Sequence, residues 1–357
     1  MLENTNHLLT HQKRLTVGYF GGSITEGACA SDPAFCWRGL TNTWLRETYP
    51  DCEITDIQAA IGGTGSDLGI FRLEHDLLSK SPDLIFIEFS TNDSGREYYE
   101  TLADSETLVR KILQANPCAD IVYVHTQTKG IADLLAKGIE HNARAAHSTV
   151  MRHYHLPQID IGEVLRTRIL LEGGDWLLYT ADNVHPNDAG YRIYADAMID
   201  FLKEALAAPA PDTLAEKALP VPLGDDKRLA SRLVDAPLPL PDGWTLVTDK
   251  TLCGRYPHYI EATVPGTELS FTFEGRRVGI YMMMASDSGD VEFSLDGSPF
   301  DVYRTWDFYC ERFDRANAHL FGDELPYGEH TLTLRVASTH AEKSKGTAIR
   351  IGAFLVY

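Results

Sequence analysis

Short apolar, β-prone runs alternate with amphipathic stretches of helical length over the first two hundred residues of the chain. The strands are expected at residues 15–20, 54–60, 84–89, 121–125 and 158–161. The helices are expected at residues 66–80, 105–114, 131–153 and 187–207. Strands that alternate with helices of this length run parallel, because each helix carries the chain back along the sheet. The pattern therefore predicts an α/β fold with a mostly parallel sheet and helices on both faces.

Small or polar residues follow the first three expected strands, at the sheet edge where open α/β proteins bind ligands. Ser23 follows the first strand through Gly21 and Gly22. Gly63 follows the second strand, and Asn92 follows the third. A strand that breaks at two glycines raises the next residue above the sheet edge, which makes Ser23 a candidate nucleophile. A plain turn or a phosphate-binding loop is the alternative, although the glycine spacing fits neither a dinucleotide fingerprint nor a Walker loop.

A serine hydroxyl attacks an ester efficiently only when a base accepts its proton. Asp182 and His185 stand three positions apart, just before the last expected helix. This spacing brings a carboxylate within reach of the imidazole ring. His185 is therefore the candidate base, and Asp182 is the candidate residue that holds its neutral tautomer. An acidic residue at a helix start beside an exposed histidine is the alternative interpretation.

The tetrahedral intermediate of ester cleavage also needs hydrogen-bond donors for its oxyanion. Three donors are available at the same edge: the backbone N–H of Ser23, the backbone N–H of Gly63 and the side-chain amide of Asn92. Gly63 suits this task because a residue without a Cβ lets the backbone approach a ligand closely. A tight turn at Gly63 and a strand-end turn at Asn92 are the simpler interpretations.

The second half of the chain lacks the alternation of strands and helices and begins with a proline-rich segment. Seven prolines fall within residues 208–243, where they disfavour a regular helix or a central strand. Beyond them, strands are expected at residues 269–273, 278–282, 291–295, 330–336 and 349–356. The expected organisation is a catalytic α/β domain over 1–207, a linker over 208–243 and an antiparallel β-sandwich over 244–357.

Composition narrows the partners and the compartment. The net charge of −19 disfavours nucleic acids and anionic membranes as partners, because both are negatively charged. The first residues lack the apolar core of a signal peptide, and no stretch approaches the length of a membrane span. Six cysteines are scattered without C-x-x-C pairing, which favours reduced thiols over a zinc site. We therefore expect a cytoplasmic protein without a bound metal.

Four segments of the chain resemble, in order, the motif blocks of the SGNH (GDSL-type) hydrolases. They are Gly21–Thr25, Ile61–Gly65, Ser90–Asp93 and Asp182–Pro186. The resemblance implies that Ser23 is the nucleophile, that His185 is the base and that Asp182 orients the base. It also implies that the oxyanion hole is formed by Ser23, Gly63 and Asn92.

The resemblance covers roughly residues 14–207 and implies a flavodoxin-like, five-stranded parallel sheet between helices. It further implies hydrolysis of esters or thioesters without a metal or a cofactor. Two positions depart from the usual pattern of the family. Gly22 stands where an aspartate is usual, and Ser90 stands where a glycine is usual. Neither position carries the chemistry.

The order of a hydrolase segment followed by a β-sandwich is similar to that of two-domain carbohydrate acetylesterases. This similarity implies a serine esterase that removes O-acetyl groups from hemicellulose-type oligosaccharides, with mannan first and xylan second. The β-sandwich then resembles a carbohydrate-binding domain, and its aromatic stretch 303–313 makes Trp306 a candidate for stacking on a sugar ring. Packing inside the sandwich is the alternative for Trp306. An acyl-thioesterase or lysophospholipase, and a catalytically weak carbohydrate-binding protein, are the alternative functions.

Overall fold

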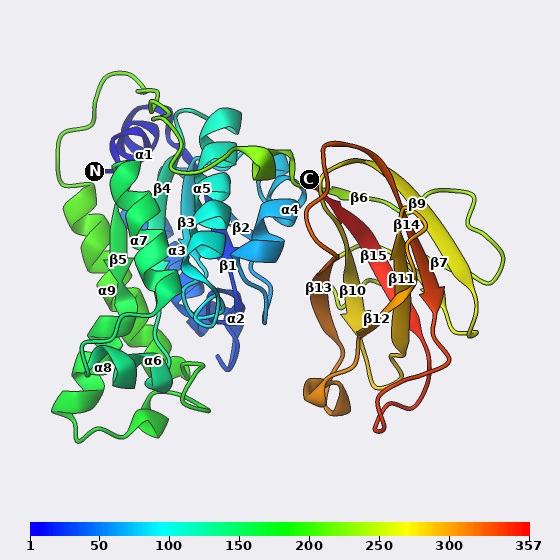
Figure 1. The fold of residues 1–357 in the computed structure, drawn as a ribbon. Helices are drawn as coiled ribbons and strands as arrows, with labels where there is room; N and C mark the ends of the chain where they lie inside the picture. The colour runs from blue at the N-terminus through cyan, green and yellow to red at the C-terminus, as the bar shows by residue number, and fades with distance from the viewer. The chain divides into compact units, whose positions relative to one another are not determined.

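Five parallel strands form the centre of the N-terminal part of the chain (Figure 1). The computed structural model describes all 357 residues. The strands are β1 Arg14–Gly21, β2 Glu53–Gln58, β3 Leu84–Glu88, β4 Asp120–His125 and β5 Gln158–Asp160. Their order in the sheet is β2-β1-β3-β4-β5, which is the flavodoxin-like order, and every neighbouring pair is parallel. The predicted fold class is confirmed for this part of the chain.

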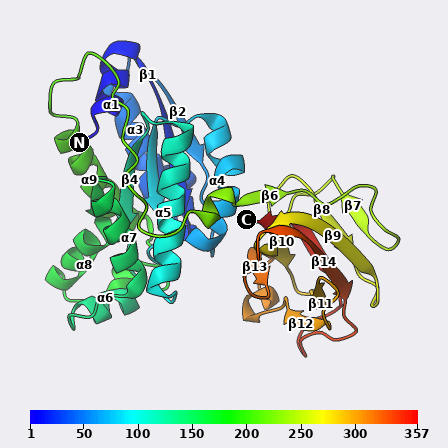
Figure 2. The ribbon, with the colours of Figure 1, turned by 45° about the horizontal axis from the view of Figure 1, so that its top comes forward.

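Helices cover both faces of this sheet (Figure 2). They are α1 Glu3–His7, α2 Ser23–Glu26, α3 Trp37–Thr48, α4 Ser66–Asp76, α5 Tyr98–Ala115, α6 Lys129–Leu135, α7 Asn142–His153, α8 Ile161–Leu171 and α9 Asp188–Ala205. Short 3₁₀ turns lie at Pro33–Phe35, Leu78–Lys80, Trp176–Leu178 and Lys227–Ala230, and a π turn lies at Leu8–Gln12. No helix combines the length and the apolar character that crossing a membrane requires.

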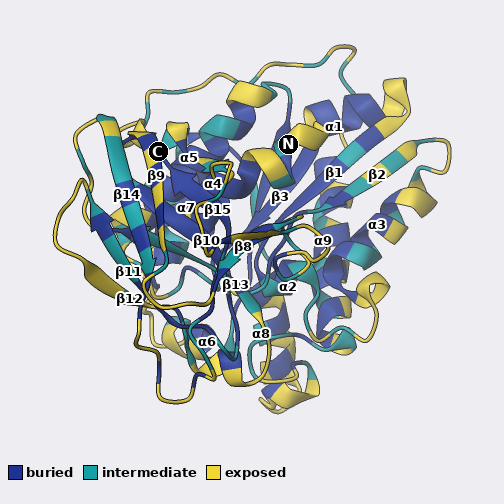
Figure 3. Cartoon of the chain, turned by 90° about the vertical axis from the view of Figure 1, so that its right-hand side faces the viewer, coloured by how far each residue is buried: buried dark blue, intermediate teal, exposed yellow.

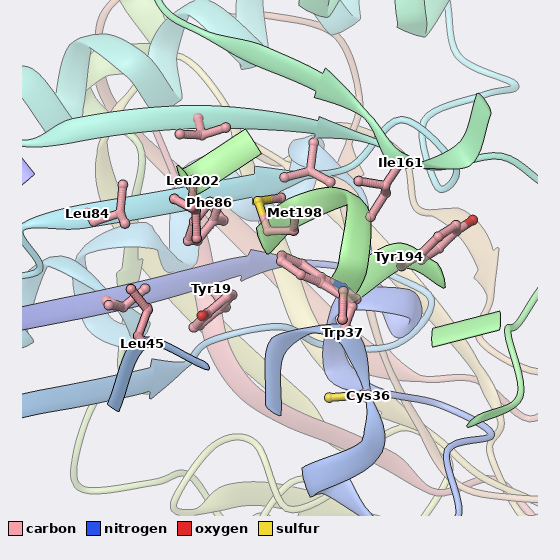
Figure 4. Close-up of a cluster of buried hydrophobic side chains, with 14 of the residues drawn as sticks. Tyr19, Cys36, Trp37, Leu45, Leu84, Phe86, Ile161, Tyr194, Met198 and Leu202 are labelled. Atoms are coloured by element: carbon pink, nitrogen blue, oxygen red, sulfur yellow. The ribbon is translucent and has the colours of Figure 1, made fainter. Parts of the chain in front are cut away.

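Alternate side chains of the central strands pack against different helix layers, as the pleat of a strand requires. On one face, Tyr19 of β1 and Phe86 of β3 pack with Trp37 of α3 and with α9 (Figure 4). On the other face, Tyr123 of β4 stacks on His147 of α7. Most residues of β1 and all residues of β3 are buried, and dark blue marks such residues in Figure 3.

Three of the differences between the observed and the predicted helices have identifiable local causes. The helix expected over 131–153 is wrong as one unit, because Gly138 adopts a left-handed φ of +75° after α6 and His141 then caps α7. The pattern did not predict α3, whose residues include glycine, threonine and tryptophan, all weak helix formers. It also missed α8, because Asp160 both ends β5 and caps the helix, which leaves no loop between them.

The C-terminal part of the chain is a sandwich of two antiparallel sheets, as predicted. Its strands are β6 Arg232–Val234, β7 Thr245–Val247, β8 Tyr259–Ala262, β9 Glu268–Gly275, β10 Val278–Met284, β11 Asp290–Leu295, β12 Asp301–Arg304, β13 Arg315–Phe321, β14 Gly328–Val336 and β15 Ile349–Val356. One sheet has the order β13-β10-β15-β8-β7, with β6 paired to β15, and the other has the order β12-β11-β14-β9. Residues of β9 alternate between exposed and buried, so that one face of the strand lines the sandwich core. A 3₁₀ turn at Phe308–Glu311 follows β12.

The structure divides the chain into two compact units, Met1–Leu229 and Ala230–Tyr357. The proline-rich segment 208–243, expected to be a linker, is shared between them. Its first part lies along the first unit, where the N–H of Lys217 donates to the Pro117 carbonyl and the N–H of Leu223 donates to Glu106. Its later part contributes β6 to the second unit. Extended backbone between prolines still offers N–H and carbonyl groups for such contacts.

Candidate active site

The turn that carries Ser23 is built from residues without side chains. Strand β1 ends at Gly21, and Gly22 leads directly into the short helix α2, which begins at Ser23. The N–H of Gly22 donates to the Glu88 carbonyl of β3 at 3.2 Å. A Cβ on Gly21 would lie 2.5 Å from the same carbonyl oxygen, so only glycine lets the turn lie this close to β3. Ser23 is therefore held at the carboxyl edge of the sheet, as predicted from the two glycines.

Ser23, His185 and Asp182 form one hydrogen-bonded series. Ser23 Oγ lies 2.8 Å from His185 Nε2, and His185 Nδ1 lies 2.8 Å from Asp182 Oδ2. A carboxylate can only accept, so Nδ1 carries the ring proton and Nε2 is left to accept from the serine hydroxyl. This arrangement matches the one that a serine nucleophile needs in order to be activated.

Backbone contacts hold Asp182 in place. Its second oxygen, Oδ1, accepts the N–H of Val184 at 3.0 Å and the N–H of His185 at 2.8 Å. Partial burial raises the pKa of Asp182, but the hydrogen bonds from the backbone and the ring of His185 outweigh it and hold the pKa below its usual value. Asp182 is therefore a carboxylate at neutral pH, although half of its side chain is exposed.

The turn after β2 lies beside the serine. The N–H of Gly62 donates to Glu26 Oε2 of helix α2 at 2.7 Å. A Cβ on Gly62 would lie 3.5 Å from the Cβ of Ser23. Gly63 itself is exposed and adopts a φ of +74°, which a residue with a side chain rarely takes. The predicted donor Gly63 thus belongs to a turn that is fixed against the nucleophile helix.

Asn92 lies against the turn that carries Ser23, next to Gly22. A Cβ on Gly22 would stand 1.9 Å from Asn92 Oδ1 and 3.5 Å from Asn92 Nδ2. The amide of Asn92 therefore occupies the space that a side chain at position 22 would fill, directly before Ser23. In this structure, a residue with a Cβ at position 22, including the aspartate that is usual in the family, would require the Asn92 side chain to move.

A buried carboxyl group, Glu88, contacts two of these segments, although no motif in the sequence marks it. Glu88, at the end of β3, accepts the Thr25 hydroxyl at 3.0 Å and the Thr126 hydroxyl at 2.7 Å. Thr126 in turn contacts the loop of Asn92, since its N–H donates to Ser90 Oγ at 3.1 Å. Burial raises the pKa of Glu88, and the two threonine hydrogen bonds offset this only in part. The sequence feature that could have identified Glu88 is a lone glutamate within the apolar run Leu84–Phe89.

Trp306 lies in the second unit, where it is half-buried and packs against the core of the sandwich. Its indole Nε1 is buried without a hydrogen-bond partner. The exposed rings of the same stretch are Phe308, Tyr309 and Phe313, each about half exposed at 53%, 49% and 54%. The aromatic stretch thus presents rings to solvent, but mainly through residues other than Trp306.

No group of three or more histidine, cysteine, aspartate or glutamate side chains is arranged to hold a metal ion. All six cysteines are free thiols.

Comparisons with known proteins identify a family for the first part of the chain and a shared fold for both parts. Residues 19–193 match the model of the GDSL-like Lipase/Acylhydrolase family, which confirms the resemblance seen in the sequence motifs. A solved structure described as a two-domain esterase (CEX) active on acetylated mannans has a TM-score of 0.85 and 24% identity, over 100% of this chain and 95% of that chain. The same esterase co-crystallized with mannopentaose has a TM-score of 0.82 and 24% identity, over 96% of this chain and 90% of that chain. These likenesses show a shared fold across both parts of the chain. A comparison with curated protein sequences finds no match.

Proposed function

Because residues 19–193 place the first unit in the GDSL-like lipase/acylhydrolase family, we propose that this ester hydrolase removes O-acetyl groups from acetylated hemicellulose-type oligosaccharides. Mannan oligosaccharides are the first candidate and xylan oligosaccharides the second. The observation that carries the proposal is the hydrogen-bonded series of Ser23, His185 and Asp182 at the carboxyl edge of the sheet. The esterase with a similar two-part fold is described as active on acetylated mannans, which supports the choice of substrate class.

In the first half-reaction, Ser23 Oγ attacks the carbonyl carbon of the acetyl ester while His185 Nε2 accepts the hydroxyl proton. The 2.8 Å contact between these atoms places the base for this transfer. Asp182 accepts from Nδ1 and stabilises the imidazolium that forms. The tetrahedral intermediate then expels the sugar oxygen, which receives the proton from His185 Nε2 and leaves as a free hydroxyl. The acetyl group stays on Ser23.

In the second half-reaction, His185 removes a proton from water, and the resulting nucleophile attacks the acetyl-serine. Collapse of this intermediate releases acetate and returns the proton to Ser23. In both halves the negative oxygen needs fixed donors. The proposal assigns this role to the N–H groups of Ser23 and Gly63 and to the side-chain amide of Asn92. Both donors lie near the serine turn, since a Cβ at Gly62 would lie 3.5 Å from the Cβ of Ser23 and one at Gly22 would lie 1.9 Å from Asn92 Oδ1.

The second unit is proposed to bind carbohydrate through its aromatic stretch. Aromatic rings stack on sugar faces, and Phe308, Tyr309 and Phe313 offer such rings to solvent. Trp306 remains a proposed contact residue, because its half-buried ring carries an indole N–H without a partner. A cytoplasmic location is part of the same proposal and is favoured by the six free thiols.

The test is mass spectrometry of acetylated mannan and xylan oligosaccharides after incubation with the full chain. We expect stepwise loss of acetyl groups with the wild-type protein and none above background with Ser23→Ala, because members of such a triad act as a unit. Retention of more than a few per cent of turnover in Ser23→Ala would make Ser23 the wrong nucleophile. Esters of increasing acyl length separate the alternative thioesterase or lysophospholipase activity, which prefers long chains.

One variant, assayed on two substrates, tests the carbohydrate contact. Trp306→Ala should lower kcat/KM on acetylated oligosaccharides and leave turnover of a small aryl acetate nearly unchanged. Equal losses on both substrates would identify a tryptophan that only supports the sandwich core.

A further inference from the structure

A buried carboxylate outside the proposed triad connects the two turns that carry Gly63 and Asn92. Asp93 follows Asn92 directly, and its side chain is fully buried. Asp93 Oδ1 accepts the N–H of Ser66, the first residue of α4, at 3.0 Å. Helix α4 begins three residues after Gly63, so the bond joins the Asn92 loop to the end of the Gly63 turn.

The contact satisfies the first N–H group of a helix whose N-cap residue has no side chain. The N-cap residue of α4 is Gly65, which has no side chain to accept the orphan N–H groups of the first turn. A Cβ on Gly65 would lie 2.2 Å from Asp93 Oδ1. The carboxylate of Asp93 therefore occupies the space beside Gly65 and caps a helix from a different segment of the chain. The N-terminus of α4 also favours a negative charge at this position.

Asp93 also contacts His147 of α7 and Arg96. Asp93 Oδ2 lies 2.9 Å from Nε2 of His147, which is itself fully buried on α7. Arg96 lies 3.5 Å from Asp93 Oδ1 and donates to the Ser66 hydroxyl at 3.0 Å. Asp93 is thus held from α7 and from its own loop while it contacts the turn at α4.

We propose that Asp93 is a positioning residue for the oxyanion hole, which fixes the Asn92 amide and the Gly63 turn relative to each other. The inference rests on the proposed ester hydrolysis, because only that reaction gives these donors a common target. Loss of the hydrogen bond between Asp93 and Ser66 should misplace both donors in the transition state. Binding of a small ester in the ground state should not change. The expected signature is a fall in kcat with little change in KM.

The first experiment measures kcat and KM of the full chain on a small aryl acetate for Asp93→Asn. This change keeps the shape of the side chain but puts an N–H₂ group where one of two acceptors stood. We expect kcat to fall about 10- to 100-fold, as for a misplaced catalytic donor. Asp120→Asn is the matched control. Asp120 is also a buried carboxylate that accepts hydrogen bonds from the backbone N–H of Thr5 and from the ammonium group of Lys217. It lies at the opposite edge of the sheet.

The second experiment removes the N–H that Asp93 accepts and spares the carboxylate. Ser66 is the first residue of α4, where proline is tolerated. Ser66→Pro should therefore reproduce the loss in kcat, and Ser66→Ala, which removes only the hydroxyl, should not. This pair decides the question if Asp93→Asn does not fold.

A double-mutant cycle with Asn92→Ala identifies the route of the effect. If Asp93 acts through the oxyanion donors, the combined loss in kcat is clearly smaller than the product of the single losses. A loss in Asp93→Asn no greater than in Asp120→Asn, or losses that multiply in the cycle, would overturn the inference. Ser23→Ala in the same assay separates the two proposals. Turnover that survives in Ser23→Ala overturns the proposed function, whereas an inactive Ser23→Ala beside an unaffected Asp93→Asn overturns the positioning role alone.

Discussion

At the scale of single residues, the candidate site depends on positions where a side chain is missing. Gly22 is the clearest case, because a Cβ at this position would overlap the side-chain amide of Asn92. Gly22→Ala would force the new methyl group against Asn92 Oδ1, which stands 1.9 Å from that point. We expect kcat on an aryl acetate to fall about 10²- to 10³-fold, the usual cost of losing one oxyanion donor. Gly95→Ala is the matched control, since a Cβ there meets no atom within 4 Å. Equal activity of the two variants would show that Asn92 takes no part in turnover.

The sequence motifs predicted some residues of the candidate site and missed others. The motifs predicted which turns meet at Ser23, because each turn follows a strand and parallel strands bring such turns to one edge. They did not predict Asp93 as a connecting residue. Its partners Ser66 and His147 stand 27 and 54 positions away, and nothing in the local pattern marks either contact.

At the scale of elements, Glu88 connects helix α2 to the end of β4 through Thr25 and Thr126. Burial raises its pKa, so the folded protein holds the proton to a higher pH than the unfolded chain, whose glutamates have a pKa of about 4.3. The stabilising contribution is complete below that value and is lost as the pH rises through the raised pKa. Glu88→Gln cannot titrate. The melting temperature of the wild type, measured relative to that of Glu88→Gln, should therefore fall as the pH rises from 4 toward neutrality. Each kcal/mol of unfolding free energy that is lost should lower it by about a few degrees. A difference that does not change with pH would mean that Glu88 titrates as in the unfolded chain.

The same scale explains the errors in predicting the helices. All five parallel strands were predicted, because a buried central strand is a short, nearly continuous apolar run. Helix α3 was missed although Trp37 is fully buried, because its remaining positions are mostly polar or weakly helix-forming. Helices α6 and α7 were merged, because the left-handed turn at Gly138 depends on a backbone conformation that composition does not specify.

At the scale of the whole molecule, the end of the first unit decides which fragment is stable. The proline-rich texture predicted an end at residue 207, whereas the compact unit runs to Leu229. Within the added segment, Lys217 lies 2.7 Å from Asp120, whose side chain is almost fully buried. Arg228 lies 2.6 Å from Asp104, which is buried to the same degree. A fragment that stops at 207 loses both cations and leaves two buried carboxylates with fewer partners.

We therefore expect the fragment 1–229 to be markedly more stable than the fragment 1–207. Removing one partner of a buried ion pair typically costs about 3–5 kcal/mol, and Asp104 keeps Arg96 as a second partner at 2.6 Å, so its share of the loss is smaller. Urea unfolding of the two fragments measures the difference directly. Lys217→Ala and Arg228→Ala, made singly in the longer fragment, apportion it between the two pairs, and we expect the larger loss from Lys217→Ala because Asp120 has no other cation. If the two fragments unfold at the same urea concentration, residues 208–229 add no stability, and the sequence-based end at 207 is the better description of the unit.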